Sequence, residues 1–407
     1  MSCKKVPGIL TNGWQDQKLN HRFFFAGANA ADSLKKNSPQ RRRTKAAIKI
    51  VANDPKETAA AAGLRYVSDQ SPGICRRRKG TTFIYYNNEG RQLRGPSEIK
   101  RIRCLAIPPA WERVWICPHA SGHLQATGYD SKGRKQYKYH PNWRAVRDEV
   151  KFERLLSFAE VLPKIRNRVD EDIRRPELSR EKVLATVVRL LELSLIRIGN
   201  EEYAKENNSF GLTTMRNRHA EIDGSTVRFR FRGKSGKQHT VEVSDRRVAK
   251  IIQKCQDLPG QHLFEYQDSN GDIASIASED VNEYLHNITG QPFSAKDFRT
   301  WAGTVLAAIA LTKIEEVDSQ SIAKKNVVTA IEAVARLLGN TAAICRKCYI
   351  HPAIPTSYLN GTLAHNLQKK ADSEIAEHLH ELKPEEAAVI AMLRQELADR
   401  SVKGPQV

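Results

Sequence analysis

The stretch EKVLATVVRLLELSLIRIGN, residues 181–200, decides the fold class of this chain. Its apolar residues recur at helical spacing, so one broad face of a helix is predicted to be buried against other helices. Gly199 suits the end of such a helix, and Arg197 would then lie in its last turn. The predicted buried face comprises Val183, Leu184, Val187, Val188, Leu191, Leu195 and Ile198.

A short β interruption follows this helix. In AEIDGSTVRFRFRGKSGKQHTVEVS, residues 220–244, apolar and basic side chains alternate, and the loop GKSGK contains Lys234. Helical patterns resume from residue 248 to 366. Residues 146–365 are therefore predicted to form an α-helical domain with a small β-sheet. KPEEAAVIAMLRQELADR predicts one more helix in a C-terminal tail, residues 366–407.

The preceding segment, residues 63–145, has the pattern of a small, mainly β domain. TTFIYYNNEGRQL is typical of a hairpin, and RVWICP, GHLQATGYD and RKQYKYH alternate like strands. A short helix is predicted in SEIKRIRCLAI, ahead of two prolines. Residues 1–62 are basic and show no sustained period, which predicts a disordered tail. The expected fold class is α+β.

The charge of the chain favours nucleic acid as a partner. Its 407 residues include 66 Lys and Arg against 46 Asp and Glu, a net charge of +20. A polyanion relieves the self-repulsion of such an excess, although a merely soluble basic protein is the alternative. No run approaches the ~20 apolar residues of a membrane span, and the N-terminus lacks the apolar core of a secretory signal. We expect a cytoplasmic, nucleoid-associated protein with reduced cysteines.

Five residues of the helical domain are candidates for chemistry, and each has a structural alternative. Arg197 could form an ion pair with a carboxylate, and Arg299 could be an ordinary structural arginine. Lys234 could be a solvated turn residue. Asn340 could cap a helix, and Tyr349 could pack in the core.

The two cysteines of CRKC, residues 345–348, invite a metal or redox interpretation. A structural zinc site needs four ligands, and no second Cys or His pair stands at metal spacing. Packing is the preferred interpretation of both cysteines, and we expect no metal or other cofactor.

Together, the five candidates suggest phosphoryl chemistry. Cleaving a phosphodiester without a metal requires a nucleophile, cationic or hydrogen-bonding groups around the non-bridging oxygens, and an acid for the leaving oxygen. An ordered set of Arg, Lys, Arg, Asn and Tyr in a strongly basic protein can provide all of these groups.

At these residues the sequence resembles the type IB DNA topoisomerases, specifically their poxvirus-like bacterial branch. The resemblance covers roughly residues 60–365. The motifs that carry it are GLRYVSDQSPGICRRRKG, IPPAWERVWICP, GHLQATGYDSKGRKQYKYHPNWR, LIRIGNEEYAKENNSFGLTTMRNRH, FRGKSGK, KDFRTWAGT and LGNTAAICRKCY.

The resemblance implies an enzyme that relaxes supercoiled DNA without ATP or metal. Tyr349 would attack a DNA phosphorus, form a 3′-phosphotyrosyl bond and release a 5′-hydroxyl. Lys234 would protonate the departing oxygen. Arg197 and Arg299 would bind the non-bridging oxygens as forked donors. The broken strand would rotate, and the 5′-hydroxyl would reverse the reaction.

One departure concerns Asn340, because poxvirus and eukaryotic members carry a histidine there, whereas bacterial members have asparagine. An amide can donate a hydrogen bond to a phosphate oxygen but cannot titrate. We therefore expect Asn340 to contact an oxygen, with no acid or base role.

The resemblance also implies that the β domain closes over the duplex to form a C-shaped clamp, and that the protein acts as a monomer. Lys135, Tyr137 and Tyr139 alternate onto one strand face, with Gln136 on the other, and this segment contacts DNA in relatives. Packing in the sheet is the alternative for both tyrosines.

Two other functions remain open at this point. A tyrosine site-specific recombinase shares the Arg, Lys, Arg, Tyr order, but its second arginine usually follows a His-x-x-Arg pattern, and here Lys296 stands three residues before Arg299. A non-catalytic, DNA-coating protein would need the basic surface but not this ordered set.

Overall fold

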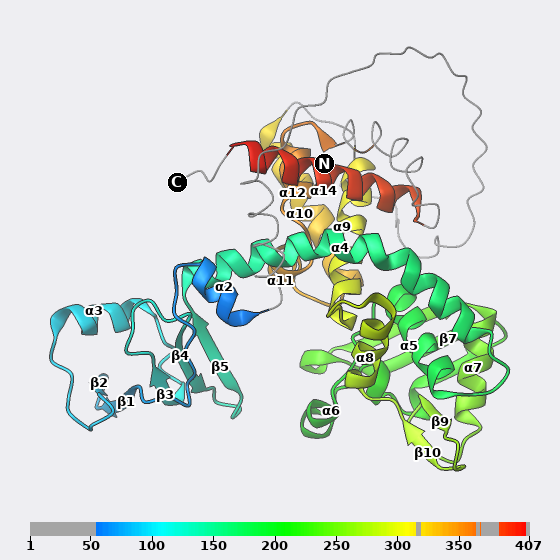
Figure 1. Ribbon diagram of the computed structural model, residues 1–407, viewed down its shortest axis with the longest axis horizontal. Helices are drawn as coiled ribbons and strands as arrows, with labels where there is room; N and C mark the ends of the chain where they lie inside the picture. The colour runs from blue at the N-terminus through cyan, green and yellow to red at the C-terminus, as the bar shows by residue number, and fades with distance from the viewer. Residues whose placement is uncertain (1–53, 315–318, 364–366, 368–381, 404–407) are drawn as a thin grey trace, which may run out of the picture. The chain divides into compact units, whose positions relative to one another are not determined.

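The computed structural model describes residues 54–314, 319–363, 367 and 382–403 (Figure 1). The chain divides into two units, Met1–Ala46 and Ala47–Val407, and all described residues belong to the second. Most of the predicted tail, residues 1–53, lies outside the described residues. The prediction of disorder is wrong for residues 55–61, because α2, Pro55–Ala61, forms there behind the N-cap Asp54.

A five-stranded antiparallel sheet has the order β2-β1-β3-β4-β5. This confirms the predicted hairpin and the three strand patterns that follow it. The strands are β1, Ile74–Lys79; β2, Thr82–Tyr86; β3, Glu112–Ile116; β4, Leu124–Tyr129; and β5, Lys135–Tyr139.

One face of this sheet is covered by α3, Pro96–Cys104, and we call it the inner face. Ile102 of α3 is buried in a cluster with four apolar residues of the strands. Because side chains alternate along a strand, the intervening residues lie on the opposite, outer face. The four strand residues are Ile74, Val114, Ile116 and Ala126.

The helical part begins directly after β5, with the 33-residue helix α4, Pro141–Ile173. Trp143 in its first turn packs with Ala59 of α2 and with Leu64. The next helix, α5, Arg180–Ser194, is almost wholly buried in the main apolar core.

The predicted end of α5 at Gly199 is wrong, since the helix stops at Ser194. Leu195 adopts a left-handed conformation with φ 56°, which turns the chain out of the helix. The following residues are irregular and bind another segment: the amide of Leu212 donates to the carbonyl of Arg197, and that of Thr213 to the carbonyl of Ile198. Arg197 therefore lies in an irregular segment and not in a helical turn.

The predicted β interruption forms a three-stranded antiparallel sheet of β6, Ala220–Asp223, β7, Thr226–Arg232, and β8, Gln238–Ser244. Helix α6, Glu201–Asn207, precedes it, and α7, Arg246–Gln256, follows. A second small hairpin, β9, Glu265–Gln267, and β10, Ile273–Ser275, interrupts the region that the sequence predicted as helical. Helix α8 then covers Ser278–Thr289.

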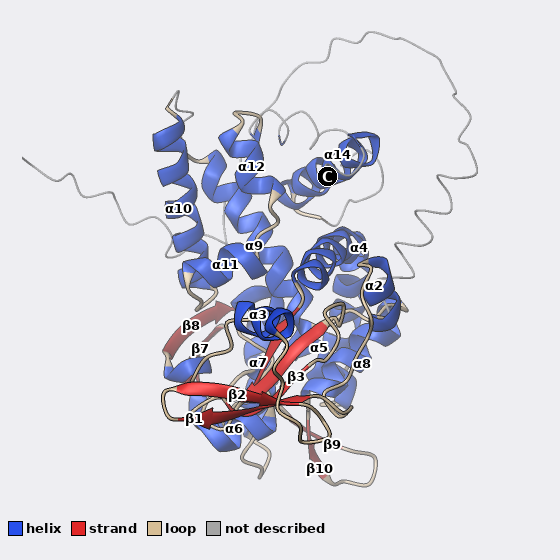
Figure 2. Cartoon of the chain, turned by 90° about the vertical axis from the view of Figure 1, so that its left-hand side faces the viewer, coloured by secondary structure: helices blue, strands red, loops and turns tan. Residues whose placement is uncertain are grey.

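The remaining described helices are α9, Ala295–Thr312; α10, Gln320–Leu337; α11, Ala342–Cys348; α12, Ala353–Leu359; and α14, Pro384–Lys403. Figure 2 shows α9, α10 and α12 beside one another, and these three pack pairwise. The predicted C-terminal helix is confirmed by α14, which packs on α4 and α9.

A buried ionic cluster joins α14 to this core. Arg166 of α4 contacts both Glu192 of α5, at 2.6 Å, and Glu386 of α14, at 2.9 Å. Glu386 also accepts a hydrogen bond from the indole of Trp301 in α9, at 3.1 Å. Burial alone would raise the pKa of Glu386, but the hydrogen bond and charge of Arg166 outweigh it and the pKa is lowered.

Helices and small antiparallel sheets thus make up the described chain, which confirms the α+β expectation at this level. No single described helix is long and apolar enough to cross a membrane; by length and composition alone, α10 and α11 pass together, with a bend of 93° between them.

Candidate active site

The structure brings Arg197 and Asn340 into contact, although 143 positions separate them. The Arg197 guanidinium donates to the Asn340 side-chain oxygen at 2.5 Å. Because an arginine can only donate, this contact fixes the orientation of the amide. The Asn340 Nδ2 is consequently left as a buried donor that has no partner among the described residues.

Asn340 does not cap the next helix, so that structural alternative is wrong. The N-cap of α11 is Thr341, whose hydroxyl accepts from the amide of Ile344. Gly339 turns the chain with φ 61°, and the Asn340 amide bonds back to Ala335. The side chain of Asn340 therefore bonds Arg197 and not a helix terminus.

Arg299 lies in the second turn of α9 and is 4% exposed. Its guanidinium donates to the carbonyl of Leu338, at 2.7 Å, and to that of Leu195. The carbonyl of Leu195 is available because the helix ends there, so the unexpected end of α5 helps to hold the arginine. Arg299 Nε is another buried donor without a partner among the described residues.

The two arginines are not neutralised. Within the described part of the chain, neither Arg197 nor Arg299 forms a salt bridge with a carboxylate, which contradicts the ion-pair alternative for Arg197. Burial, and then the repulsion of Arg197, lower the pKa of Arg299 to about 10, so it remains a cation at neutral pH. Two adjacent cations held by neutral oxygens form a site with excess positive charge that an anion would satisfy.

Lys234 begins the short turn that joins β7 to β8, as the sequence predicted. The turn requires left-handed conformations at Ser235, φ 65°, and Gly236, φ 75°. Lys234 is exposed, and with Arg197 and Arg299 it lines a cavity of about 20 Å³. This is room for one water molecule, so a phosphate group would lie at the mouth of the cavity.

Tyr349 follows the last residue of α11 and is half-buried. The Arg299 guanidinium lies 5.3 Å from the centre of its ring. Two contacts hold its backbone against α9: the Thr304 hydroxyl donates to the Tyr349 carbonyl at 3.3 Å and accepts from the His351 amide at 3.1 Å. Gly303 permits this approach, because a Cβ there would lie 2.6 Å from the Tyr349 oxygen.

Lys151 is a residue of this region that the sequence did not single out. It projects from α4, and its ammonium donates to the carbonyl of Cys348 at 2.6 Å. Burial lowers the pKa of Lys151. This bond ties the last residue of α11, next to Tyr349, to a helix 197 positions earlier in the chain. No local pattern in the sequence could have indicated it.

His239 is a second residue that was missed. It lines the same cavity, and its ring stacks on Phe231 at 5.2 Å between centroids. Any side chain at Gly233 or Gly339 would collide with the ring. Burial lowers the pKa of His239, and the charge of Arg197 lowers it further. Its place two residues into β8, directly after the lysine turn, was the available signal.

The predicted DNA-contacting segment is β5. Tyr137 is 45% exposed and stacks on Tyr139, with 6.0 Å between ring centroids. Tyr139 also packs against the cluster that contains Trp143, so the packing alternative holds in part for this residue. Lys135 pairs with Asp69 at 2.6 Å. Gln136, on the inner side, donates to Asp130 at 3.0 Å.

The cysteines next to Tyr349 lie where a packing role places them. Cys345 is buried in the main core and Cys348 is half-buried at the end of α11. Over residues 54–314, 319–363 and 382–403, no group of three or more His, Cys, Asp or Glu side chains could hold a metal ion.

Two cations line this small cavity with a lysine at its rim, an unpartnered amide donor lies beside Arg197, and a tyrosine ring lies against Arg299. These are the groups that a phosphoryl-transfer site requires. Comparison with known protein families shows which class of phosphoryl-transfer enzyme this chain belongs to. The model described as the catalytic core of eukaryotic DNA topoisomerase I matches residues 140–374, more than half of the chain. The N-terminal domain of bacterial DNA topoisomerase IB matches residues 82–130. The chain belongs to the type IB DNA topoisomerases.

Individual relatives agree with this assignment. The DNA topoisomerase 1B of Acanthamoeba polyphaga mimivirus is 31% identical over 285 residues, which are 68% of this chain and 85% of that protein. The DNA topoisomerase 1B of vaccinia virus, strain Copenhagen, is 26% identical over 252 residues, 60% of this chain and 74% of that protein. The DNA topoisomerase 1 of Mycosarcoma maydis is 25% identical over 204 residues, 44% of this chain and 20% of that protein.

Proposed function

We propose that this enzyme relaxes supercoiled DNA by cutting one strand through Tyr349, letting the strand rotate, and rejoining it. The observation that carries the proposal is the pair of un-neutralised arginines beside the tyrosine. A buried positive site of this kind is costly unless an anion occupies it, and the family acts on DNA, whose backbone supplies one.

The positions of the side chains support the following roles. The Tyr349 oxygen attacks the phosphorus, and the bond from phosphorus to the 5′ oxygen breaks. Arg197 and Arg299 stabilise the charge on the non-bridging oxygens as forked donors. The free Nδ2 of Asn340 adds a neutral donor to the same group.

Proton transfer completes the cleavage step. Lys234, exposed at the rim of the cavity, supplies a proton to the departing 5′ oxygen, and the phenol proton leaves to solvent. The products are a 3′-phosphotyrosyl bond and a 5′-hydroxyl, so the bond energy is retained and religation is the reverse reaction. Every group required for this sequence belongs to the chain, and we propose that neither ATP nor a metal ion takes part.

The five-stranded sheet is proposed to bind the duplex through β5, with the two parts of the enzyme forming a C-shaped clamp around DNA. Tyr137, exposed beside Lys135, supports a contact to the duplex. We further propose a monomeric, bacterial enzyme that works in the cytoplasm at the nucleoid.

Plasmid relaxation tests the function. Purified protein is incubated with supercoiled plasmid in EDTA without ATP, and wild type is compared with Tyr349→Phe. We expect complete relaxation by wild type and none by the variant, with DNA binding retained by both. If neither protein relaxes DNA while both bind it, the proposal is wrong and the recombinase and DNA-coating alternatives return.

A further inference from the structure

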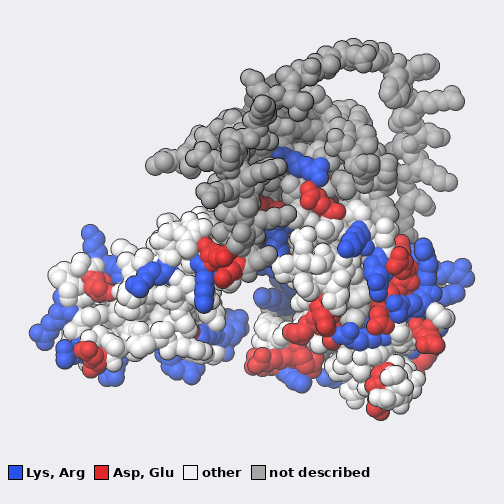
Figure 3. All heavy atoms as spheres, in the orientation of Figure 1, with Lys and Arg blue, Asp and Glu red and all other residues white. Residues whose placement is uncertain are grey.

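The outer face of the five-stranded sheet carries three basic residues, of which only Lys135 pairs with a described carboxylate, that of Asp69. Three basic residues lie over aromatic rings there: Arg77 is 5.0 Å from the Tyr86 centroid, Arg113 is 3.9 Å from Tyr129, and Lys135 is 5.7 Å from Tyr137. Figure 3 shows Lys and Arg side chains over the β1–β2 end of this domain and again over β5.

Strand register places these pairs on one face. Cys75 pairs with Trp115, Trp115 with Thr127, and Thr127 with Tyr137, so these four residues share the face opposite α3. Arg77 lies two residues beyond Cys75 and therefore shares it. The ring of Tyr129, two residues beyond Thr127, carries the guanidinium of Arg113 onto the same face.

The three cations occupy the open end of the outer face. Its other part is crossed by residues 68–73: Asp69 accepts from Thr127 at 3.0 Å, and the Ser71 carbonyl accepts from the Trp115 indole at 2.9 Å. Arg77 and Arg113 are exposed, and neither forms a salt bridge or side-chain hydrogen bond with any described residue.

A neighbouring arginine shows how a structural role differs. Arg76, on the inner face, donates to the carbonyls of Ile107, Pro108 and Trp111 and is only half exposed. The stacked guanidiniums of Arg77 and Arg113 keep the donors at their edges free. An aromatic ring under a guanidinium fixes its plane without using those donors, which leaves the fork available to a phosphate.

We infer that Arg77 and Arg113 extend the duplex-binding surface from β5 across the outer face to β1, as two additional phosphate contacts. From β5 to β1 there are three strand spacings, about 14 Å in total. A duplex carries one negative charge per about 1.7 Å when both strands are counted, so this length carries about eight phosphates, of which two contacts use a minority. The inference rests on the proposed function, because it takes β5 to face DNA.

Salt-dependent binding tests the inference. Dissociation constants for a linear duplex are measured against salt concentration in the inactive Tyr349→Phe background, with and without Arg77→Gln plus Arg113→Gln. Losing two phosphate contacts should lower the slope of log K against log salt by about 1.8. Between about 50 and about 200 mM salt, the parent should then lose about 12-fold more affinity than the double variant.

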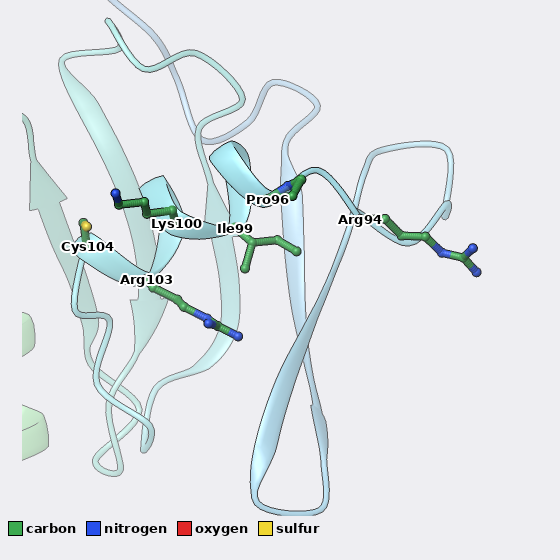
Figure 4. Close-up of a pocket in the computed structure, with 6 residues that line it drawn as sticks. All are labelled: Arg94, Pro96, Ile99, Lys100, Arg103 and Cys104. Carbon is green, nitrogen blue, oxygen red and sulfur yellow. The ribbon is translucent and has the colours of Figure 1, made fainter.

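The matched control removes two cations from the inner side of the same domain. Lys100 and Arg103 are exposed on α3 and extend in different directions from it (Figure 4). Lys100→Gln plus Arg103→Gln should leave the slope unchanged. An equal change in both double variants, or no change in either, overturns the inference.

Two further arms separate the causes of failure. The variant Arg77→Lys plus Arg113→Lys keeps both charges, so its slope of log K against log salt should equal that of the parent, even if the glutamine variant is less stable. A lower slope in the lysine variant overturns the phosphate role. Plasmid relaxation by the protein with Tyr349 intact is measured in parallel. If the protein relaxes plasmid but the glutamine double variant has an unchanged slope, only the inference about this surface is wrong. If the protein does not relax plasmid, the proposed function is wrong.

Discussion

Replacing Gly303 with alanine tests how closely the tyrosine segment is held against α9. The added Cβ would lie 2.6 Å from the Tyr349 carbonyl oxygen, which belongs to the backbone and cannot rotate away. Ordinary contact begins near 3.4 Å, so the segment must move by about 0.8 Å. Without a collision, alanine in a helix would stabilise the protein by about 0.5 to 1 kcal/mol. Overpacking costs about 1 to 3 kcal/mol, so the net loss of stability should lie between about 0 and about 2.5 kcal/mol.

The same movement should slow DNA cleavage. Displacing a reacting group by about an ångström can cost about 100-fold in rate. Single-turnover formation of the covalent adduct on a labelled duplex should fall 10- to 100-fold by this argument, while the dissociation constant changes little. Ala302→Ser, which adds one heavy atom at the neighbouring, half-buried position, is the control and should cleave normally. A Gly303→Ala protein that is more stable than wild type and cleaves at the same rate would refute the reasoning.

Three other outcomes are expected. Asn340→Asp should raise the melting temperature, because the carboxylate pairs with Arg197, yet lower adduct formation about 100- to 1000-fold, because it removes a donor and repels phosphate; undiminished cleavage contradicts the oxygen contact. Lys151→Met should slow cleavage about tenfold at unchanged DNA affinity, with Lys151→Arg restoring part of the rate; equal rates in all three proteins would show that the bond to Cys348 does not position Tyr349. Urea denaturation should show a free energy of unfolding that falls as the pH drops below about 6.5, since buried and half-buried histidines with lowered pKa values protonate preferentially in the unfolded chain, at up to about 1.4 kcal/mol each per pH unit. These histidines are His123, His219 and His239.

The structural features that could be predicted from the sequence are those determined by neighbouring residues. The alternation of apolar and basic side chains over residues 220–244 located the hairpin that carries Lys234, and its apolar residues Val227, Phe229 and Phe231 are buried. A helix cap was expected at Asn340, and the cap of α11 lies one residue later, at Thr341. These features depend on residues within a few positions of one another, so propensity and periodicity suffice to find them.

Features determined by distant segments could not be predicted in this way. The apolar period continues past Ser194, but the helix ends there because the next residues pair with Leu212 and Thr213. Likewise, nothing near Lys151 or Asn340 indicates that one will bind a helix end and the other an arginine. Tertiary contacts override helix propensity after Ser194, and they create the arrangement of side chains around Lys151 and Asn340.

The repulsion between Arg197 and Arg299 has a thermodynamic consequence for the enzyme without DNA. Folding brings two like charges together and gives them only neutral oxygens as partners, so the empty site lowers the stability of the fold. Any anion that fits between the arginines binds the folded chain more tightly than the unfolded one and raises stability by mass action. If a DNA phosphate binds between these arginines, DNA should therefore raise the melting temperature of the enzyme as well as serve as its substrate.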